Sequence, residues 1–173
     1  VNYDWNFLNY PIHTVSANPE KTSKECAILL IHGFGASTDH WRFNIPILSK
    51  KYEVHAMDLL GFGKSPKPQD IEYSGSLWKD QVIAYVKEKI KKPTIVVGNS
   101  LGGYAALAAG SELHELNAGV ILLNAAGYFS EEKTIKKNML QTSIETVAGI
   151  FLKNVVLQRL IFENMRNPKN IKK

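Results

Sequence analysis

Four short apolar runs, each followed by a glycine or a polar turn, divide the first three quarters of the chain. They lie at 26–32, 52–57, 94–99 and 119–125. Runs of this length without polar alternation are typical of strands that are buried on both faces of a parallel sheet. A fifth stretch, at 10–17, is expected to form a further strand at an edge of the same sheet.

Apolar residues recur at helical intervals between these runs. The spacing predicts a helix around 38–50 and an amphipathic helix over 76–90, which Ser76 is expected to cap. Residues 101–110 predict a third helix, built of small residues. Strands and helices that alternate with short connections indicate an α/β fold, with a mostly parallel sheet flanked by helices.

The pattern changes at the end of the fourth run, and this change predicts the domain organisation. We place an α/β core at 1–127 and the start of a helical cap at 128–173. Residues 144–162 are helical in character, and their apolar stripe is wider than a solvated surface helix needs. Packing on the core or on chain outside this sequence is the favoured interpretation, and a helix at a membrane interface is the alternative.

Composition supports one compact globular domain. Of the 173 residues, 45% are hydrophobic and 10% are aromatic, which argues against disorder. No run of eighteen uncharged apolar residues exists, so we expect no membrane span. The single cysteine, Cys26, excludes a disulfide framework and a multi-cysteine metal site, and we expect no metal and no other cofactor. Cys26 and first residues unlike a signal peptide favour a cytoplasmic location.

The net charge of +5 comes entirely from the end of the chain. Residues 1–130 carry 12 basic and 12 acidic side chains, whereas residues 131–173 carry nine basic and four acidic ones. A nucleic-acid-binding protein would not confine its charge in this way, so we expect no nucleic acid partner. A solvated basic face is the favoured interpretation of the excess, and an anionic partner is the alternative.

The strongest chemical signal is the pentapeptide GNSLG at 98–102, which follows the third apolar run. Glycine–x–serine–x–glycine between a strand and a helix is typical of a nucleophile in a strained turn whose neighbours must lack side chains. The N-terminus of the helix would direct backbone N–H groups toward an anion formed at Ser100. A glycine-rich turn with a helix-capping serine is the alternative.

A second glycine turn, IHGFG at 31–35, closes the first apolar run. Such a turn at the carboxyl end of a neighbouring strand offers a second backbone N–H to an oxyanion. We expect the N–H groups of Phe34 and Leu101 to be the two donors. His32 is expected to orient the turn, and a role as catalytic base is the less favoured alternative.

A third glycine-rich stretch, DLLGFGKS at 58–65, follows the second apolar run. Its glycines, lysine and serine suggest a phosphate cradle, but the spacing is not that of a P-loop and two prolines follow. An ordered loop near the rim of an active site is the favoured interpretation.

These three motifs, HGFGAS, DLLGFGKS and GNSLGG, resemble in their order the α/β-hydrolase superfamily over roughly residues 5–130. The resemblance implies that Ser100 is the nucleophile, that Phe34 and Leu101 form the oxyanion hole, and that a helical cap follows the fourth strand. GNSLGGY and LLNAAGYF are most similar to pheophytinase-related esterases, and GNS before GG also occurs in carbon–carbon bond hydrolases. Haloalkane dehalogenases and epoxide hydrolases place aspartate at the position of Ser100, which argues against both chemistries.

A serine nucleophile needs a base, usually a histidine that a carboxylate orients. In the family both follow the serine. His114 is the only histidine after Ser100, and the intervening helix would carry it about 15–20 Å away. We therefore expect the sequence to stop inside the cap, before the acid and the histidine, and to be inactive alone. A short non-catalytic relative is the alternative.

The sequence thus predicts a serine hydrolase that cleaves an ester-type bond of a small hydrophobic substrate through an acyl-enzyme on Ser100. Two alternatives stay open, namely a carbon–carbon bond hydrolase of the same superfamily and a non-catalytic binding module with this fold. The pattern of residues gives no oligomeric state.

Overall fold

The computed structural model describes residues 2–17 and 26–126. These residues belong to the part of the chain from Val1 to Gly127. The helical cap expected at 128–173, including the apolar stretch 144–162, lies outside the described residues.

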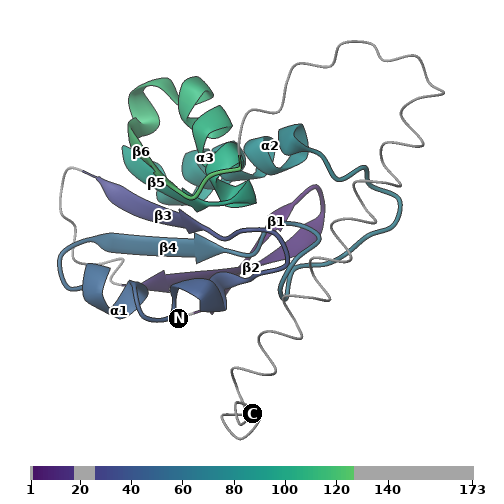
Figure 1. Cartoon of the computed structure of the whole chain (residues 1–173), viewed down its shortest axis with the longest axis horizontal. Helices are drawn as coiled ribbons and strands as arrows, with labels where there is room; N and C mark the ends of the chain where they lie inside the picture. The colour runs from purple at the N-terminus through teal and green to yellow at the C-terminus, as the bar shows by residue number, and fades with distance from the viewer. Residues whose placement is uncertain (1, 18–25, 127–173) are drawn as a thin grey trace, which may run out of the picture. The chain divides into compact units, whose positions relative to one another are not determined.

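A six-stranded sheet forms the centre of this part, in the order β1-β2-β4-β3-β5-β6 (Figure 1). Strand β3 pairs in parallel with β4 and β5, and β5 pairs in parallel with β6, so the predicted mostly parallel sheet is confirmed. The strands are β1 (Asn2–Phe7), β2 (Tyr10–Ala17), β3 (Ala27–Ile31), β4 (Glu53–Met57), β5 (Thr94–Asn99) and β6 (Asn117–Leu123).

The edge of the sheet carries one strand that the sequence pattern did not reveal. Strand β1 pairs antiparallel with β2, and β2 pairs antiparallel with β4. The turn between β1 and β2 consists of Leu8 and Asn9, both with positive φ, 50° and 66°. Two-residue hairpin turns require this conformation, but they usually contain glycine, which is why the hairpin was missed.

Two helices cover one face of the sheet, and their limits differ slightly from expectation. Helix α2 (Gly75–Tyr85) continues into one π-helical turn, η2 (Val86–Ile90), and α3 spans Leu101–Glu112. The expected cap by Ser76 is wrong, because Ser74 has the extended backbone of a capping residue. Its side-chain oxygen accepts the N–H of Leu77 at 3.2 Å.

The single helix expected around 38–50 is replaced by two short pieces. A 3-10 turn, η1, spans Thr38–Trp41, and α1 spans only Ile45–Leu48. Pro46 explains the break, since a proline has no N–H and is tolerated only in the first turn of a helix.

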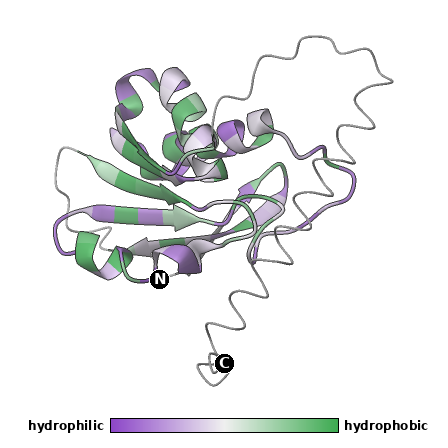
Figure 2. Cartoon of the chain, viewed as in Figure 1, coloured by the Kyte–Doolittle hydropathy of each residue, from purple (hydrophilic) through white to green (hydrophobic). Residues whose placement is uncertain are grey.

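The sheet divides the core into two layers. Alternate residues of β3 pack into one layer or the other, because successive side chains of a strand point to opposite faces. Leu29 and Ile31 pack with α2 and α3, whereas Ile28 and Leu30 pack with Trp41 on the face that α1 partly covers. Figure 2 shows β3 as hydrophobic along its length, while β4 mixes hydrophobic and hydrophilic residues. In the described ranges, no helix is both long and apolar enough to cross a bilayer.

Replacing Leu29 by alanine is expected to lower the free energy of unfolding by about 2–5 kcal/mol. Leu29 is fully buried in the central strand, so the change removes packed atoms and leaves a cavity. Urea denaturation of the intact protein measures the loss. The matched control is Leu107→Ala on α3, which is 55% exposed and should change the free energy little. Equal effects of the two substitutions would contradict this assignment of the core.

Candidate active site

The carboxyl ends of three neighbouring parallel strands bring the sequence motifs to one edge of the sheet. In the register of the strands, Ile31 of β3 lies beside Met57 of β4 and beside Gly98 of β5. The turns that follow these residues carry His32, Asp58 and Ser100 respectively. The IHGFG and GNSLG turns therefore lie on adjacent strands, as the sequence predicted.

Ser100 lies at the sharp turn between β5 and α3 in an unusual backbone conformation. Its φ is 52° and its ψ is −117°, and its side chain makes no capping hydrogen bond to the helix. A capping serine has an extended backbone instead, so the capping alternative is wrong. A positive φ at a residue other than glycine costs about 1–3 kcal/mol and persists only where the surroundings enforce it.

Strand β6 and the chain after it hold this turn from one side. The N–H of Ser100 donates to the carbonyl of Leu123 at 3.1 Å, and its own carbonyl accepts the N–H of Ala126 at 3.0 Å. Gly33 of the IHGFG turn approaches from the other side. A Cβ atom on Gly33 would lie 3.1 Å from the Cβ of Ser100.

The two glycines of the pentapeptide allow α3 to approach the sheet at backbone contact. A Cβ atom at Gly98 would lie 2.1 Å from the carbonyl oxygen of Gly102. A Cβ atom at Gly102 would lie 2.5 Å from the carbonyl oxygen of His32. Any side chain at either position would push the helix away from the strand ends, so the spacing of these glycines reflects a steric requirement.

The same arrangement brings together the turns that carry the two expected oxyanion donors. Phe34 follows Gly33, where an added Cβ atom would lie 3.1 Å from the Cβ of Ser100, and Leu101 follows Ser100 as the first residue of α3. Both N–H groups thus belong to residues adjacent to the contact between the turns. Their role as oxyanion donors stays a prediction.

His32 connects the first two motifs and is fully buried. Its Nδ1–H donates to the carbonyl of Gly33 at 2.7 Å, and its Nε2 accepts the N–H of Leu59 at 3.0 Å. Burial lowers the pKa of His32 below its ordinary value. Because backbone groups occupy both ring nitrogens, the side chain orients the two turns, and the alternative role as catalytic base is not supported.

The carboxylate of Asp58 fills the loop that resembled a phosphate cradle. It accepts the N–H of Lys64 at 2.7 Å and the N–H of Thr38 at 2.6 Å. At Gly63, whose φ is 54°, a Cβ atom would lie 2.2 Å from this carboxylate. A bound phosphate would need the space and the N–H groups that the carboxylate uses, so the loop is an ordered structural element.

Gln81 of α2 is a positioning residue that the sequence analysis missed. Its side chain is fully buried, accepts the N–H of Leu60 at 2.9 Å and donates to the carbonyl of Asp58 at 3.2 Å. A polar residue at a buried position of the amphipathic pattern over 76–90 was the available signal.

His114, by contrast, lies far from Ser100 along the chain's path. It begins η3 (His114–Leu116), after the twelve residues of α3. Twelve helical residues span about 18 Å, as the sequence led us to expect. In the part of the chain that the structure describes, no three metal-binding side chains gather.

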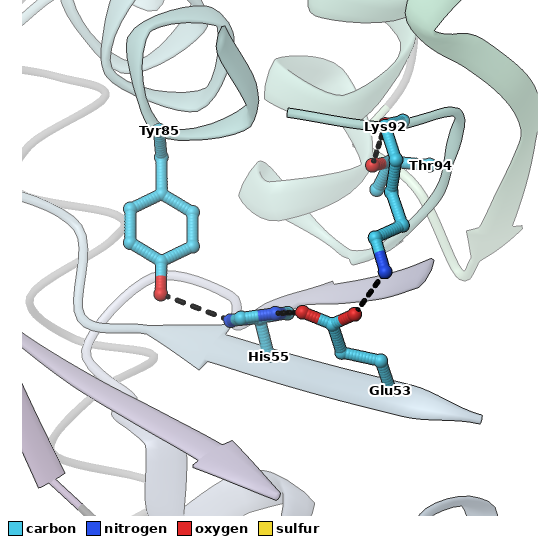
Figure 3. A network of polar contacts seen from close by, with 5 residues as sticks. All are labelled: Glu53, His55, Tyr85, Lys92 and Thr94. Carbon is cyan, nitrogen blue, oxygen red and sulfur yellow. Dashed lines mark hydrogen bonds and ion pairs between the residues drawn. The ribbon is translucent and has the colours of Figure 1, made fainter. Parts of the chain in front are cut away.

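A second polar network lies at the other end of β4 (Figure 3). The Nε2–H of His55 donates to Glu53 at 2.8 Å, and its Nδ1 accepts the hydroxyl of Tyr85 at 3.1 Å. The second oxygen of Glu53 forms an ion pair with Lys92 at 2.5 Å. The network joins β4 to α2 and to the loop before β5, so it supports the scaffold and is separate from the edge that carries Ser100.

Burial and hydrogen bonding together determine the protonation of this network. Burial lowers the pKa of His55 and raises the pKa of Tyr85 to about 12. Burial alone would raise the pKa of Glu53, but the hydrogen bonds from Lys92 and His55 outweigh burial and lower it. Glu53 is therefore ionised and His55 neutral in the folded protein near neutral pH.

Comparisons with known proteins agree with this architecture. The family model described as alpha/beta hydrolase fold matches residues 27–164, so the chain belongs to the α/β-hydrolase family. A structure of a serine hydrolase involved in carbazole degradation is 32% identical. It superimposes with a TM-score of 0.65 over 83% of this chain and 55% of that one.

Two curated proteins are similar to this chain in sequence. A 2-hydroxy-6-oxo-6-(2'-aminophenyl)hexa-2,4-dienoic acid hydrolase of Metapseudomonas resinovorans is 42% identical over 60% of this chain. Chloroplastic pheophytinase of Arabidopsis thaliana is 32% identical over 84% of this chain. The matched part is 37% of the length of each relative.

Acidification is expected to destabilise the protein below about pH 6.5, the usual pKa of histidine. Burial lowers the pKa of both His32 and His55, so the unfolded chain binds protons more tightly than the folded one. This contribution to stability is complete above the unfolded pKa and is lost as the pH falls through the folded pKa. Urea denaturation at a series of pH values measures the change in the free energy of unfolding.

A substitution tests one of the two buried histidines. His55→Gln should reduce the pH dependence, because it removes a side chain whose pKa burial lowers. A free energy of unfolding that does not change with pH in this range would contradict the assignment.

Proposed function

We propose that Ser100 is the nucleophile of a serine hydrolase that cleaves an ester-type bond. The observation that carries this proposal is the positive φ of Ser100 at a strand–helix turn where its side chain does not cap the helix. A conformation of this cost is typical of functional residues. The similarity to a structure described as a serine hydrolase supports the same interpretation.

The proposed reaction uses groups of both turns. The hydroxyl oxygen of Ser100 attacks the carbonyl carbon, and a base takes the hydroxyl proton. The N–H groups of Phe34 and Leu101 stabilise the negative oxygen of the tetrahedral intermediate. The proton passes to the leaving alcohol, and water then hydrolyses the acyl-enzyme to release the acid and restore Ser100.

The base is proposed to come from outside these 173 residues. His32 is committed to two backbone groups, and no histidine follows His114 in the sequence. A histidine that an acidic residue orients would complete the site, in the order nucleophile, acid, histidine. The 173-residue chain by itself is accordingly expected to lack significant esterase activity.

The substrate proposed here is a small hydrophobic ester. The apolar composition of 144–162 supports it, because these residues belong to the cap that is expected at 128–173. A cap at 128–173 and a cytoplasmic location remain parts of the proposal, the latter resting on the single cysteine Cys26.

A second candidate activity is the hydrolysis of a carbon–carbon bond at the same serine. It is favoured by the relative from Metapseudomonas resinovorans, whose name describes a hydrolase of a hydroxy-oxo-hexadienoic acid. Comparing the turnover of simple esters with that of hydroxy-oxo-dienoic acids in the intact protein distinguishes the two activities.

Ser100→Ala is expected to reduce the esterase turnover of the intact protein by about 10⁴–10⁶-fold, because loss of the nucleophile removes the covalent step. A fluorophosphonate that reacts with activated serines should label the wild type at Ser100 and should leave the variant unlabelled. Hydrolysis of a chromogenic ester measures the turnover.

Ser111→Ala is the matched control, since Ser111 is an exposed serine of α3 whose hydroxyl only donates to the carbonyl of Ala108. It should keep both turnover and labelling. Wild-type turnover in the Ser100→Ala variant would refute the proposed nucleophile.

A further inference from the structure

Phe34 is a large aromatic residue in the glycine turn that lies against the turn of the proposed nucleophile. It is 53% exposed in the part of the chain that the structure describes. A Cβ atom on Gly33, the residue before it, would lie 3.1 Å from the Cβ of Ser100. A substrate at the hydroxyl of Ser100 would therefore lie close to the turn that carries Phe34.

A second aromatic ring fixes the position of Phe34. The rings of Phe34 and Phe62 meet edge to face, with centroids 5.3 Å apart and an angle of 72° between the planes. This geometry is one of the preferred arrangements of aromatic pairs. Because Phe62 belongs to the loop after β4 and Phe34 to the turn after β3, the contact also ties the two loops together.

The aromatic series continues from Phe62 into the core. The ring of Phe62 lies 5.8 Å from that of His32 and 5.7 Å from that of Trp78. Trp78 is buried, and its indole N–H donates to the carbonyl of Leu60 at 3.0 Å. The ring of Phe62 thus packs against two buried rings as well as against the ring of Phe34.

We propose that the ring of Phe34 is a specificity-determining group that selects substrates with a flat aromatic or conjugated group on the reacting carbonyl over substrates with an alkyl chain. The inference rests on the proposed function at Ser100 and adds the class of acyl group. A ring in a fixed orientation gains the additional attraction between π-systems only from a flat unsaturated partner. An alkyl chain gains area burial alone, which a leucine at this position would also provide.

The test compares two acyl groups on one alcohol in the intact enzyme. The probes are the benzoate and the hexanoate esters of the same alcohol, and the readout is the ratio of their kcat/KM values. Phe34→Leu keeps the backbone N–H and apolar surface but removes the ring, and should lower the benzoate-to-hexanoate ratio by about 3–10-fold. Phe34→Tyr keeps the ring and should preserve the ratio.

Phe43→Leu is the matched control. Phe43 is another exposed phenylalanine, 69% exposed, and its ring contacts the guanidinium of Arg42 at 4.4 Å. This substitution should leave both the ratio and the activity unchanged. Proportional losses for both esters in Phe34→Leu, or an unchanged ratio, would overturn the proposal.

A binding measurement separates this inference from the proposed function. In the Ser100→Ala background, calorimetry should show tighter binding of the benzoate ester than of the hexanoate ester. Adding Phe34→Leu should weaken benzoate binding selectively. If Ser100→Ala retained its turnover, the proposed nucleophile would fail, whereas equal effects of Phe34→Leu on both ligands would refute the aromatic selection alone.

Discussion

The backbone contact between α3 and the ends of the parallel strands is the constraint on which the rest of this site depends. At Gly98 and Gly102 even a methyl group would overlap backbone atoms of the neighbouring segment. This close approach forces the chain through a sharp turn, and Ser100 takes a positive φ as a result. The strain is balanced by hydrogen bonds to Leu123 and Ala126, so the formation of β6 and of the turn are coupled.

Buried polar side chains fix the neighbouring loops relative to this turn. His32, Asp58 and Gln81 each bind backbone groups of a segment distant in sequence, and none of them has to touch a substrate to affect the reaction. A change in any of the three would move the loops that carry Phe34 and Phe62. The proposed oxyanion hole and the proposed aromatic selection consequently share one supporting framework, while the Glu53–His55 network stabilises the opposite end of the sheet.

Several features were accessible from the sequence because they depend on local chemistry. Strands β3, β4, β5 and β6 were predicted to within two residues, since buried strands need uninterrupted apolar runs. Strand β1 was missed because its turn lacks glycine, although its apolar residues alternate with polar ones as in a half-buried strand. The predicted helix over 38–50 was too long, because its apolar spacing was given more weight than Pro46. The predicted cap of α2 was misplaced by two residues.

The sequence by itself determined the order of strands and helices and the serine at the strand–helix turn, because periodicity, glycines and short motifs act over a few residues. It also showed that His114 is the only histidine after Ser100 in these 173 residues. Only the tertiary structure decided which strands are neighbours, that the carboxylate of Asp58 fills the GFGKS loop, and that the rings of Phe34 and Phe62 meet. These contacts join residues that are far apart in the chain, and their formation depends on the packing of the whole sheet.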